Sequence, residues 1–294
     1  YEIVKDKFGT ESPEYADACV RMGTVSSRHI GVEEGFRYYQ EGVTLYEKLG
    51  VINYSYIAGL SLMCNILDKQ GQEDHAFIMR ERLINKLETV EKDYISQLLT
   101  EYIGTYPYLM HSGRIDEQVH YMEKAQNLIK KYNVAHELSE HTALVFAVPR
   151  ICYHNAGKYS KAIEEGKKSQ RFIGDTFGED CIPFAQYSIL IGFDYHFIKD
   201  SKSCKTYLID GINRLEKSYS QVGINVESDD VYLPALVFMA EQYEADDDLT
   251  NASICRQKAD RAFRYKNDTE SVDFTDNLHS LYLNYSMSGQ FLQM

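Results

Sequence analysis

The sequence contains no tryptophan, only five prolines, and fewer basic than acidic residues. No apolar run approaches the roughly 20 residues of a membrane-spanning helix, so we expect no membrane insertion by this chain. Lys and Arg number 31 against 44 Asp and Glu, which gives a net charge of −13. Because contacts to phosphates need clustered cations, this balance argues against nucleic-acid binding. Hydrophobic residues make up 44% of the chain, which excludes a disordered protein.

The motifs of common catalytic and metal sites are also missing. There is no glycine-rich phosphate loop, no nucleophile elbow and no Cys-x-x-Cys pair. His136 and His141 are five residues apart, which on a helix separates them by about 140° and prevents them from sharing a metal ion. The acidic run at 246–248 lacks the glycine and the terminal glutamate of a calcium loop. We therefore expect no enzyme, no cofactor and no metal site.

What the sequence does contain is helical spacing and internal repetition. Tyr39, Gly42, Leu45 and Tyr46 follow the i, i+3, i+4 rule of an amphipathic helix. A glycine turn followed by such a helix recurs in three segments, and a fourth segment has the same pattern without the glycine. These segments are 31–48, 113–130, 157–170 and, without glycine, 247–262. This recurrence indicates a stack of helix-turn-helix units.

The repeats resemble the tetratricopeptide motif, which has small residues at three positions where closely packed helices leave no room for a large side chain. In a gap-free alignment the first position is occupied by Gly23, Cys64, Tyr106, Arg150, Gly192 and Ala240. The second is occupied by Gly35, Ala76, Gln118, Ala162, Cys204 and Ala252, and the third by Gly42, Leu83, Ala125, Ser169, Gly211 and Ala259. The large residues in repeats three and four depart from the motif. The six cysteines are expected to be buried free thiols, three of them at packing positions: Cys19, Cys64 and Cys204.

Two connectors are similar to those of the kinesin-light-chain subtype of this family, which has long repeats. Phe8-Gly9 is followed by Pro13, and Phe177-Gly178 is followed by Pro183, so that glycine ends one helix and proline opens the next. The resemblance implies an all-α, right-handed α-solenoid of about six repeats, forming a single superhelical domain over 1–294. The repeats are expected at 12–49, 53–89, 92–132, 137–178, 180–220 and 228–267, with half-repeats at 1–9 and 270–294.

The half-repeats lead us to expect an array cut from a longer protein, with a further helix following the last one. Two prolines also fall within expected first helices. Pro107 and Pro149 each either kink such a helix or mark its start.

In the tetratricopeptide family the first helix of each repeat lines a concave binding face. Carried onto this chain residue by residue, the family's groove positions are Asn65, Asp68, Met110, Ile151, His154, Phe193, His196, Glu241 and Glu244. His154 and His196 occupy equivalent positions, so we expect them to be neighbours. Chaperone-binding members hold a peptide carboxylate with Lys and Asn at these positions. Only Asn65 matches, so that function is not expected here.

The resemblance implies a protein- or peptide-binding repeat domain. Tyrosine-rich arrays of this kind resemble those fused to bacterial sensor kinases and transcription regulators, so one hypothesis is the ligand-sensing or interaction region of a larger bacterial signal-transduction protein. The alternative is a free-standing adaptor that assembles protein complexes. A sensor-kinase input domain would be periplasmic, and otherwise the chain would be cytoplasmic. The ligand and the oligomeric state are left open by the sequence.

Overall fold

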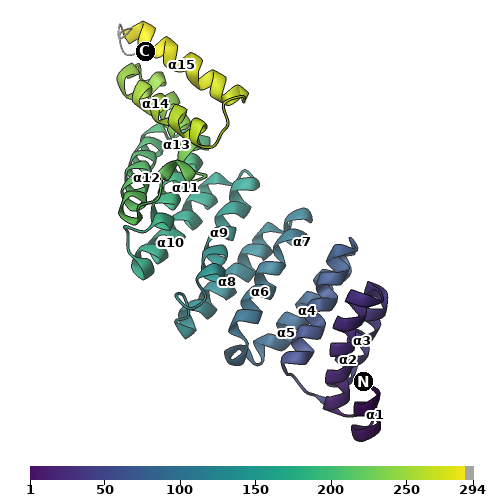
Figure 1. The fold of residues 1–294 in the computed structure, drawn as a ribbon. Helices are drawn as coiled ribbons and strands as arrows, with labels where there is room; N and C mark the ends of the chain where they lie inside the picture. The colour runs from purple at the N-terminus through teal and green to yellow at the C-terminus, as the bar shows by residue number, and fades with distance from the viewer. Residues whose placement is uncertain (289–294) are drawn as a thin grey trace. The chain divides into compact units, whose positions relative to one another are not determined.

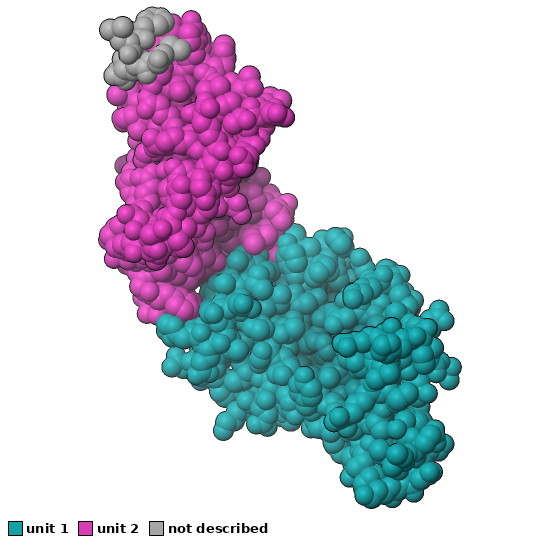
Figure 2. Space-filling model, in the orientation of Figure 1, with its two compact units in different colours: residues 1–148 teal, residues 149–294 magenta. Residues whose placement is uncertain are grey.

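The structure is a computed structural model that describes residues 1–288, and in this range every regular element is a helix (Figure 1). The chain divides after Val148 into two compact units, residues 1–148 and residues 149–294 (Figure 2). The predicted all-α repeat solenoid is therefore confirmed. The single superhelical domain over 1–294 stays a prediction, and the two units are described separately.

Unit 1 begins with a short helix and continues with three helix pairs. The short helix is α1 (Glu2–Phe8), and the pairs are α2 (Pro13–His29) with α3 (Val32–Leu49), α4 (Tyr54–Lys69) with α5 (Glu73–Glu88), and α6 (Ile95–Gly104) and α7 (Tyr106–His111) with α8 (Ile115–Tyr132). The 3-10 turn η1 (Glu91–Asp93) precedes α6, and α9 (Ser139–Asn155) starts in this unit and ends in the next.

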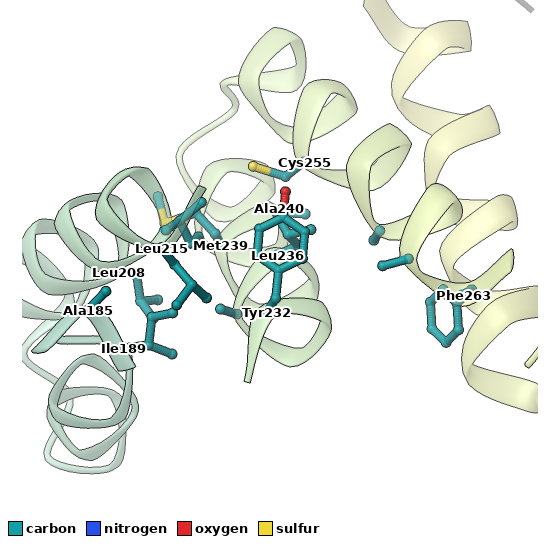
Figure 3. Close-up of a cluster of buried hydrophobic side chains, with 14 of the residues drawn as sticks. Ala185, Ile189, Leu208, Leu215, Tyr232, Leu236, Met239, Ala240, Cys255 and Phe263 are labelled. Carbon is teal, nitrogen blue, oxygen red and sulfur yellow. The ribbon is translucent and has the colours of Figure 1, made fainter. Parts of the chain in front are cut away.

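Unit 2 continues the alternation of first and second helices. Its elements are α10 (Tyr159–Phe177), α11 (Ile182–Phe197), α12 (Ser201–Val222), the 3-10 turn η2 (Val226–Ser228), α13 (Tyr232–Ala245), α14 (Leu249–Tyr265) and α15 (Val272–Ser288). The further helix expected after α15 falls outside the described residues. Apolar side chains from α11 to α15 form one buried cluster in this unit (Figure 3).

The two predicted connectors act as helix stops and starts. Gly9 follows α1 with φ 75° and Gly178 follows α10 with φ 89°, a conformation that costs glycine little. Pro13 opens α2, where Ser12 Oγ also accepts a hydrogen bond from the Tyr15 N–H at 3.2 Å. The N–H that proline lacks has no partner in the first turn of a helix in any case, so proline is well suited to this position. The connector therefore ends one helix and starts the next at low cost.

Small residues lie where first and second helices cross. A Cβ atom added at Gly42 of α3 would lie 2.8 Å from the Ala16 carbonyl oxygen of α2. At the equivalent Gly211 of α12 it would lie 2.8 Å from the Ile189 backbone nitrogen of α11. Both distances are too short for a real Cβ, so glycine is required for this close approach of the two helices.

Repeat three differs from the gap-free alignment. The first helix is interrupted after Gly104, and Thr105, which is fully buried, hydrogen-bonds Gln118 Oε1 of α8 at 2.8 Å. Thr105 therefore occupies the crossing position that the alignment gave to Tyr106. Pro107 is the second residue of α7, so it marks a helix start, whereas Pro149 lies inside α9.

Tyrosines of three first helices, α4, α6 and α13, each link a repeat to the one before it. Tyr102 of α6 donates a hydrogen bond to Glu88 of α5 at 2.7 Å, and Lys124 of α8 lies 2.8 Å from the same carboxylate. The same acid–tyrosine–cation arrangement occurs twice more within single units. The three sets are Glu47–Tyr56–Arg82, Glu88–Tyr102–Lys124 and Glu216–Tyr232–Lys258. Part of the large tyrosine content is therefore used for packing between repeats.

Candidate binding surfaces

The predicted groove residues of unit 1 lie on α4 and α7. Asn65 is exposed and lines a pocket of about 490 Å³ between α2 and α4. Asp68, one turn later, faces a second pocket of about 220 Å³ on the α5 side. Met110 is half-buried at the end of α7. Asn65 and Asp68 therefore face different pockets, although they are only three residues apart.

Asp68 takes part in a largely buried ionic cluster. The Arg80 guanidinium of α5 lies 2.8 Å from Asp68 and 2.6 Å from Glu101 of α6, whose Oε1 accepts a hydrogen bond from Ser61 at 2.7 Å. The Arg80 and Glu101 side chains are 8% and 3% exposed. A Cβ atom added at Gly104 would lie 2.2 Å from Arg80, so glycine there makes room for the guanidinium. The cluster joins three helices and carries one surplus negative charge.

A pocket of about 400 Å³ opens beside this cluster, between α4 and α6. Serine, threonine and glutamine side chains line it together with apolar ones, and Glu101 is its one charged residue among the described ones. Thr100 at its rim lies 2.9 Å from His141 of α9. The pocket therefore offers hydroxyl groups, whereas the Glu101 carboxylate in its wall is already paired with Arg80.

The predicted groove residues of unit 2 include a row of aromatic and imidazole rings. Phe193 and His196 of α11 contact Phe238 of α13 with ring centroids 5.3 and 4.4 Å apart. Phe197, which is 47% exposed, lies 5.6 Å from His196 and 5.5 Å from His154 of α9. His154 and His196 are thus bridged by Phe197.

The row ends on a stacked pair. Tyr159 at the start of α10 stacks on Phe197 with centroids 4.4 Å apart and planes 11° apart. Ile151 and Ile198 beside the row are 36% and 41% exposed. We call Tyr159, His154, Phe197, His196, Phe238 and Phe193 the ring row. Among its six members only Phe197 is exposed, and the other five are half-buried. Phe193 and Phe238 also pack against the buried cluster of unit 2.

A buried carboxylate lies under one end of the ring row. Asp194 has no exposed surface, and its oxygens lie 2.6 Å from His154 Nδ1 and 2.8 Å from Arg150 Nε. Arg150 also donates a hydrogen bond to the Leu190 carbonyl oxygen at 2.7 Å. Burial raises the pKa of Asp194 and lowers the pKa of Arg150, and in both cases their mutual attraction opposes the shift. Through its contact with Asp194, which is paired with Arg150, the His154 ring is held in one orientation.

Glu241 and Glu244 lie on α13 and do not join the ring row. Glu241 is exposed. Glu244 pairs with Arg256 of α14 at 3.0 Å and accepts a hydrogen bond from Asn284 of α15 at 2.8 Å. Arg256 and Arg80 occupy the same repeat position, as do Glu244 and Asp68. In repeats two and six an ion pair between these two positions therefore links the first helix of the repeat to its second helix.

Sequence reasoning missed Tyr159, Asp194, Phe197 and Phe238. Asp194 follows the first small position of repeat five by two residues, and it forms its contact with His154 across a separation of 40 residues. The pairs Ser61–Glu101 and Glu244–Asn284 have the same separation. A search for complementary polar residues one repeat apart would have found these contacts, because first helices of successive repeats lie side by side.

Within residues 1–288 no group of three His, Cys, Asp or Glu side chains is placed to hold a metal ion. His136 lies in the turn before α9 and His141 inside that helix, so the two are not on one helical face. All six cysteines are free, and all but Cys181 are buried. No helix in the described part is long and apolar enough to cross a membrane.

Antiparallel helix pairs of repeated length, crossing at small residues, define an α-solenoid of the tetratricopeptide-repeat type. Solved structures with this fold confirm the assignment. The sequence itself matches no protein-family model and no curated protein.

Three of the similar structures span most of this chain. RapI in its apo form is 13% identical with a TM-score of 0.63, over 96% of this chain and 77% of RapI. BtubC (BKLC) from P. vanneervenii is 14% identical with a TM-score of 0.55, over 87% of this chain and 91% of that one. A putative kinesin light chain from Podosopora anserina with TPR-like repeats is 13% identical with a TM-score of 0.50, over 71% and 98%. At these identities the likeness concerns the fold.

Proposed function

We propose that this chain is a protein- or peptide-binding repeat domain without enzymatic activity. The observation that carries the proposal is the ring row of unit 2. Aromatic side chains are enriched in protein interfaces, because they bury a large area with few rotatable bonds. Phe197 is 47% exposed at its centre, and Ile198, the next residue in the chain, is 41% exposed. A partner that covers these side chains gains the free energy of removing them from water.

The geometry favours an extended segment over a compact small molecule. The rings come from four helices, α9, α10, α11 and α13, and form a chain of ring contacts between 4.4 and 5.6 Å. Successive side chains of an extended segment can each contact a different ring along this chain. The buried Asp194–Arg150 pair holds His154 in place beforehand, which lowers the entropic cost of binding.

We further propose that the domain is the ligand-sensing or interaction region of a larger bacterial signal-transduction protein. The second candidate is an adaptor that assembles protein complexes. The full coding sequence of the parent protein separates the two. A coiled coil, a membrane span and a kinase module would support the sensing role, and their absence would favour the adaptor.

Binding is tested with a display library of random linear peptides selected on the whole chain, followed by calorimetry with the enriched peptides. Phe197→Ala should weaken binding at least about tenfold, because truncating an aromatic anchor typically costs about 1–2 kcal/mol or more. Tyr265→Ala is the matched control, since Tyr265 is 50% exposed at the end of α14, away from the ring row. Equal affinity of the two variants would exclude the ring row as the binding surface.

A further inference from the structure

The pocket that Asp68 faces combines two exposed carboxylates with aromatic side chains. It has a volume of about 220 Å³. The residues of its lining that matter here come from α4 to α7 and are Asp68, Glu73, Phe77, Arg80, Gly104 and Tyr108. Because the second helix α5 supplies three of them, this pocket differs from the two pockets that lie between first helices.

The charges around this pocket do not balance. The Arg80 guanidinium lies 2.8 Å from Asp68, but it also lies 2.6 Å from Glu101, which is 3% exposed and neutralises it. Glu73 lies 3.3 Å from His111, and an imidazole cancels a negative charge only when it is protonated. Asp68 and Glu73 are 46% and 48% exposed, so both carboxylates can accept further hydrogen bonds. The pocket therefore keeps negative charge available to a ligand.

Two stacked rings form the aromatic side of the pocket. Phe77 and Tyr108 have centroids 4.4 Å apart and planes 21° apart. The Tyr108 hydroxyl donates a hydrogen bond to Asp74 at 2.8 Å, which holds the ring in place. Arg114, outside the pocket lining, already places its guanidinium 4.9 Å from the Phe77 centroid, and Glu117 neutralises that guanidinium at 2.6 Å. The rings therefore attract a planar cation within the chain itself.

Carboxylates beside aromatic rings favour one class of cation. A guanidinium is planar, stacks on aromatic faces and donates two parallel hydrogen bonds to a carboxylate. An ammonium is a compact and strongly hydrated charge that gains less from such a site. At about 220 Å³ the pocket is smaller than the usual site of a drug-sized ligand, so it suits a single side chain.

We propose that this pocket binds the guanidinium of an arginine side chain presented by a protein partner. Asp68 and Glu73 accept its hydrogen bonds, and the Tyr108 ring contacts its plane. Arg80 stays neutralised by Glu101 when Asp68 turns to the ligand. The net charge of −13 attracts a basic segment to this chain over a longer range.

This inference rests on the proposed function insofar as the arginine belongs to a protein or peptide, but it uses unit 1 and none of the ring row. The sequence predicted Asp68 as a groove residue. Glu73 and Tyr108 were not predicted, because they come from α5 and α7 and join Asp68 only in the folded chain.

The test compares peptides selected on three forms of the whole chain from a display library of random linear peptides. The double variant Asp68→Asn/Glu73→Gln removes both charges and keeps the size of both side chains. The matched control Glu33→Gln/Asp276→Asn removes two exposed carboxylates elsewhere, so the net charge changes equally. The buried ion pair of the cluster stays intact in the double variant, so both variants should fold, which thermal unfolding verifies.

The unaltered chain and the control should enrich arginine, and the double variant should not. In calorimetry the leading arginine peptide should bind the double variant at least about tenfold more weakly than the control. Tyr108→Leu should also weaken its binding, because the aromatic face is lost. A twin peptide with citrulline, which resembles arginine in shape but is uncharged, should bind the unaltered chain and the double variant about equally. A lysine twin should bind the unaltered chain more weakly than the arginine peptide does.

Three outcomes would overturn the inference: selected peptides without arginine, equal binding of the arginine peptide to the double variant and the control, and a lysine twin that binds as tightly as the arginine peptide. Peptides that depend on Phe197 but carry no arginine would overturn it while leaving the proposed function intact. Arginine peptides that depend on Asp68 and Glu73 but not on Phe197 would support this pocket and count against the ring row.

Discussion

Asp194 is held in the interior of unit 2 by its ionic partners. With no exposed surface, its carboxylate depends on Arg150 at 2.8 Å and His154 at 2.6 Å for stabilisation. Arg150 is equally dependent, because its side chain is only 6% exposed. Ion pairs of this kind rarely add much net stability, but removing one partner leaves the other charge uncompensated in a poorly solvated place.

We therefore predict that Asp194→Ala lowers the free energy of unfolding by about 3–5 kcal/mol. The double variant Arg150→Met/Asp194→Ala should recover a large part of this loss, because the orphaned guanidinium is then gone. Urea unfolding measures both effects. Asp246→Ala is the control, since Asp246 is 56% exposed in a surface pair with Lys205, and it should change stability by less than about 1 kcal/mol. An equal loss of unfolding free energy in Asp194→Ala and Asp246→Ala would contradict this prediction.

At the level of helices, the three acid–tyrosine–cation sets link a repeat to the one before it at three places. Tyr102 is 3% exposed, and burial together with its hydrogen bond to Glu88 raises the pKa of its hydroxyl, so the phenol stays protonated and acts as the donor. Lys124 compensates the charge of the same carboxylate. A solenoid is stabilised mainly through contacts between neighbouring repeats. These sets therefore contribute at the junctions between repeats, on which the stability of the array depends.

Tyr102→Phe should lower the unfolding free energy by about 1–2 kcal/mol, because it removes a hydrogen bond to a charged acceptor while leaving the ring in place. Tyr54→Phe is the matched control. Tyr54 is 67% exposed and has no hydrogen-bond partner within residues 1–288, so its hydroxyl contributes little. Thermal or urea unfolding of the two variants separates them. A Tyr102 variant as stable as the Tyr54 variant would show that the buried hydroxyl does not link the repeats.

At the scale of the whole molecule, the buried thiols lower the free energy of unfolding as the pH becomes alkaline. Burial raises the pKa of Cys64 and of Cys152 to about 12, against about 8.5 in an unfolded chain. Each of these two thiols therefore binds its proton more tightly in the folded state than in the unfolded state. This contribution to stability is fully present below about pH 8.5 and is lost as the pH rises towards about 12.

Cys64→Ala tests this dependence. At neutral pH the variant should be less stable than the unaltered chain, because a fully buried side chain is shortened. The difference should narrow by roughly 1–2 kcal/mol by about pH 10, since only the unaltered chain then loses the contribution of the Cys64 proton. Urea unfolding at the two pH values measures it. A difference that stays constant would rule out the proposed titration.

Periodicity and turn residues in the sequence determined the helices and their order. Gly9 and Pro13 act through local backbone conformation, and Gly42 and Gly211 act through the contact of adjacent helices, so their effects can be read from neighbouring residues. The prediction that the cysteines are buried free thiols is confirmed for all but Cys181, which is half-buried. In repeat three the local rule failed, because the interruption after Gly104 shifts the crossing position to Thr105.

The binding surfaces were decided by tertiary structure. Asp194 and His154 are 40 residues apart, and Arg28 and Lys69 line one pocket only because α2 packs beside α4. Contacts between residues so far apart in the sequence depend on how each helix is rotated against the next, and small residues and helix breaks change that rotation. A sequence pattern identifies the buried face of a helix, but it does not specify which exposed side chains of successive repeats come together. The ring row and the pocket between α2 and α4 therefore became visible only in the folded chain.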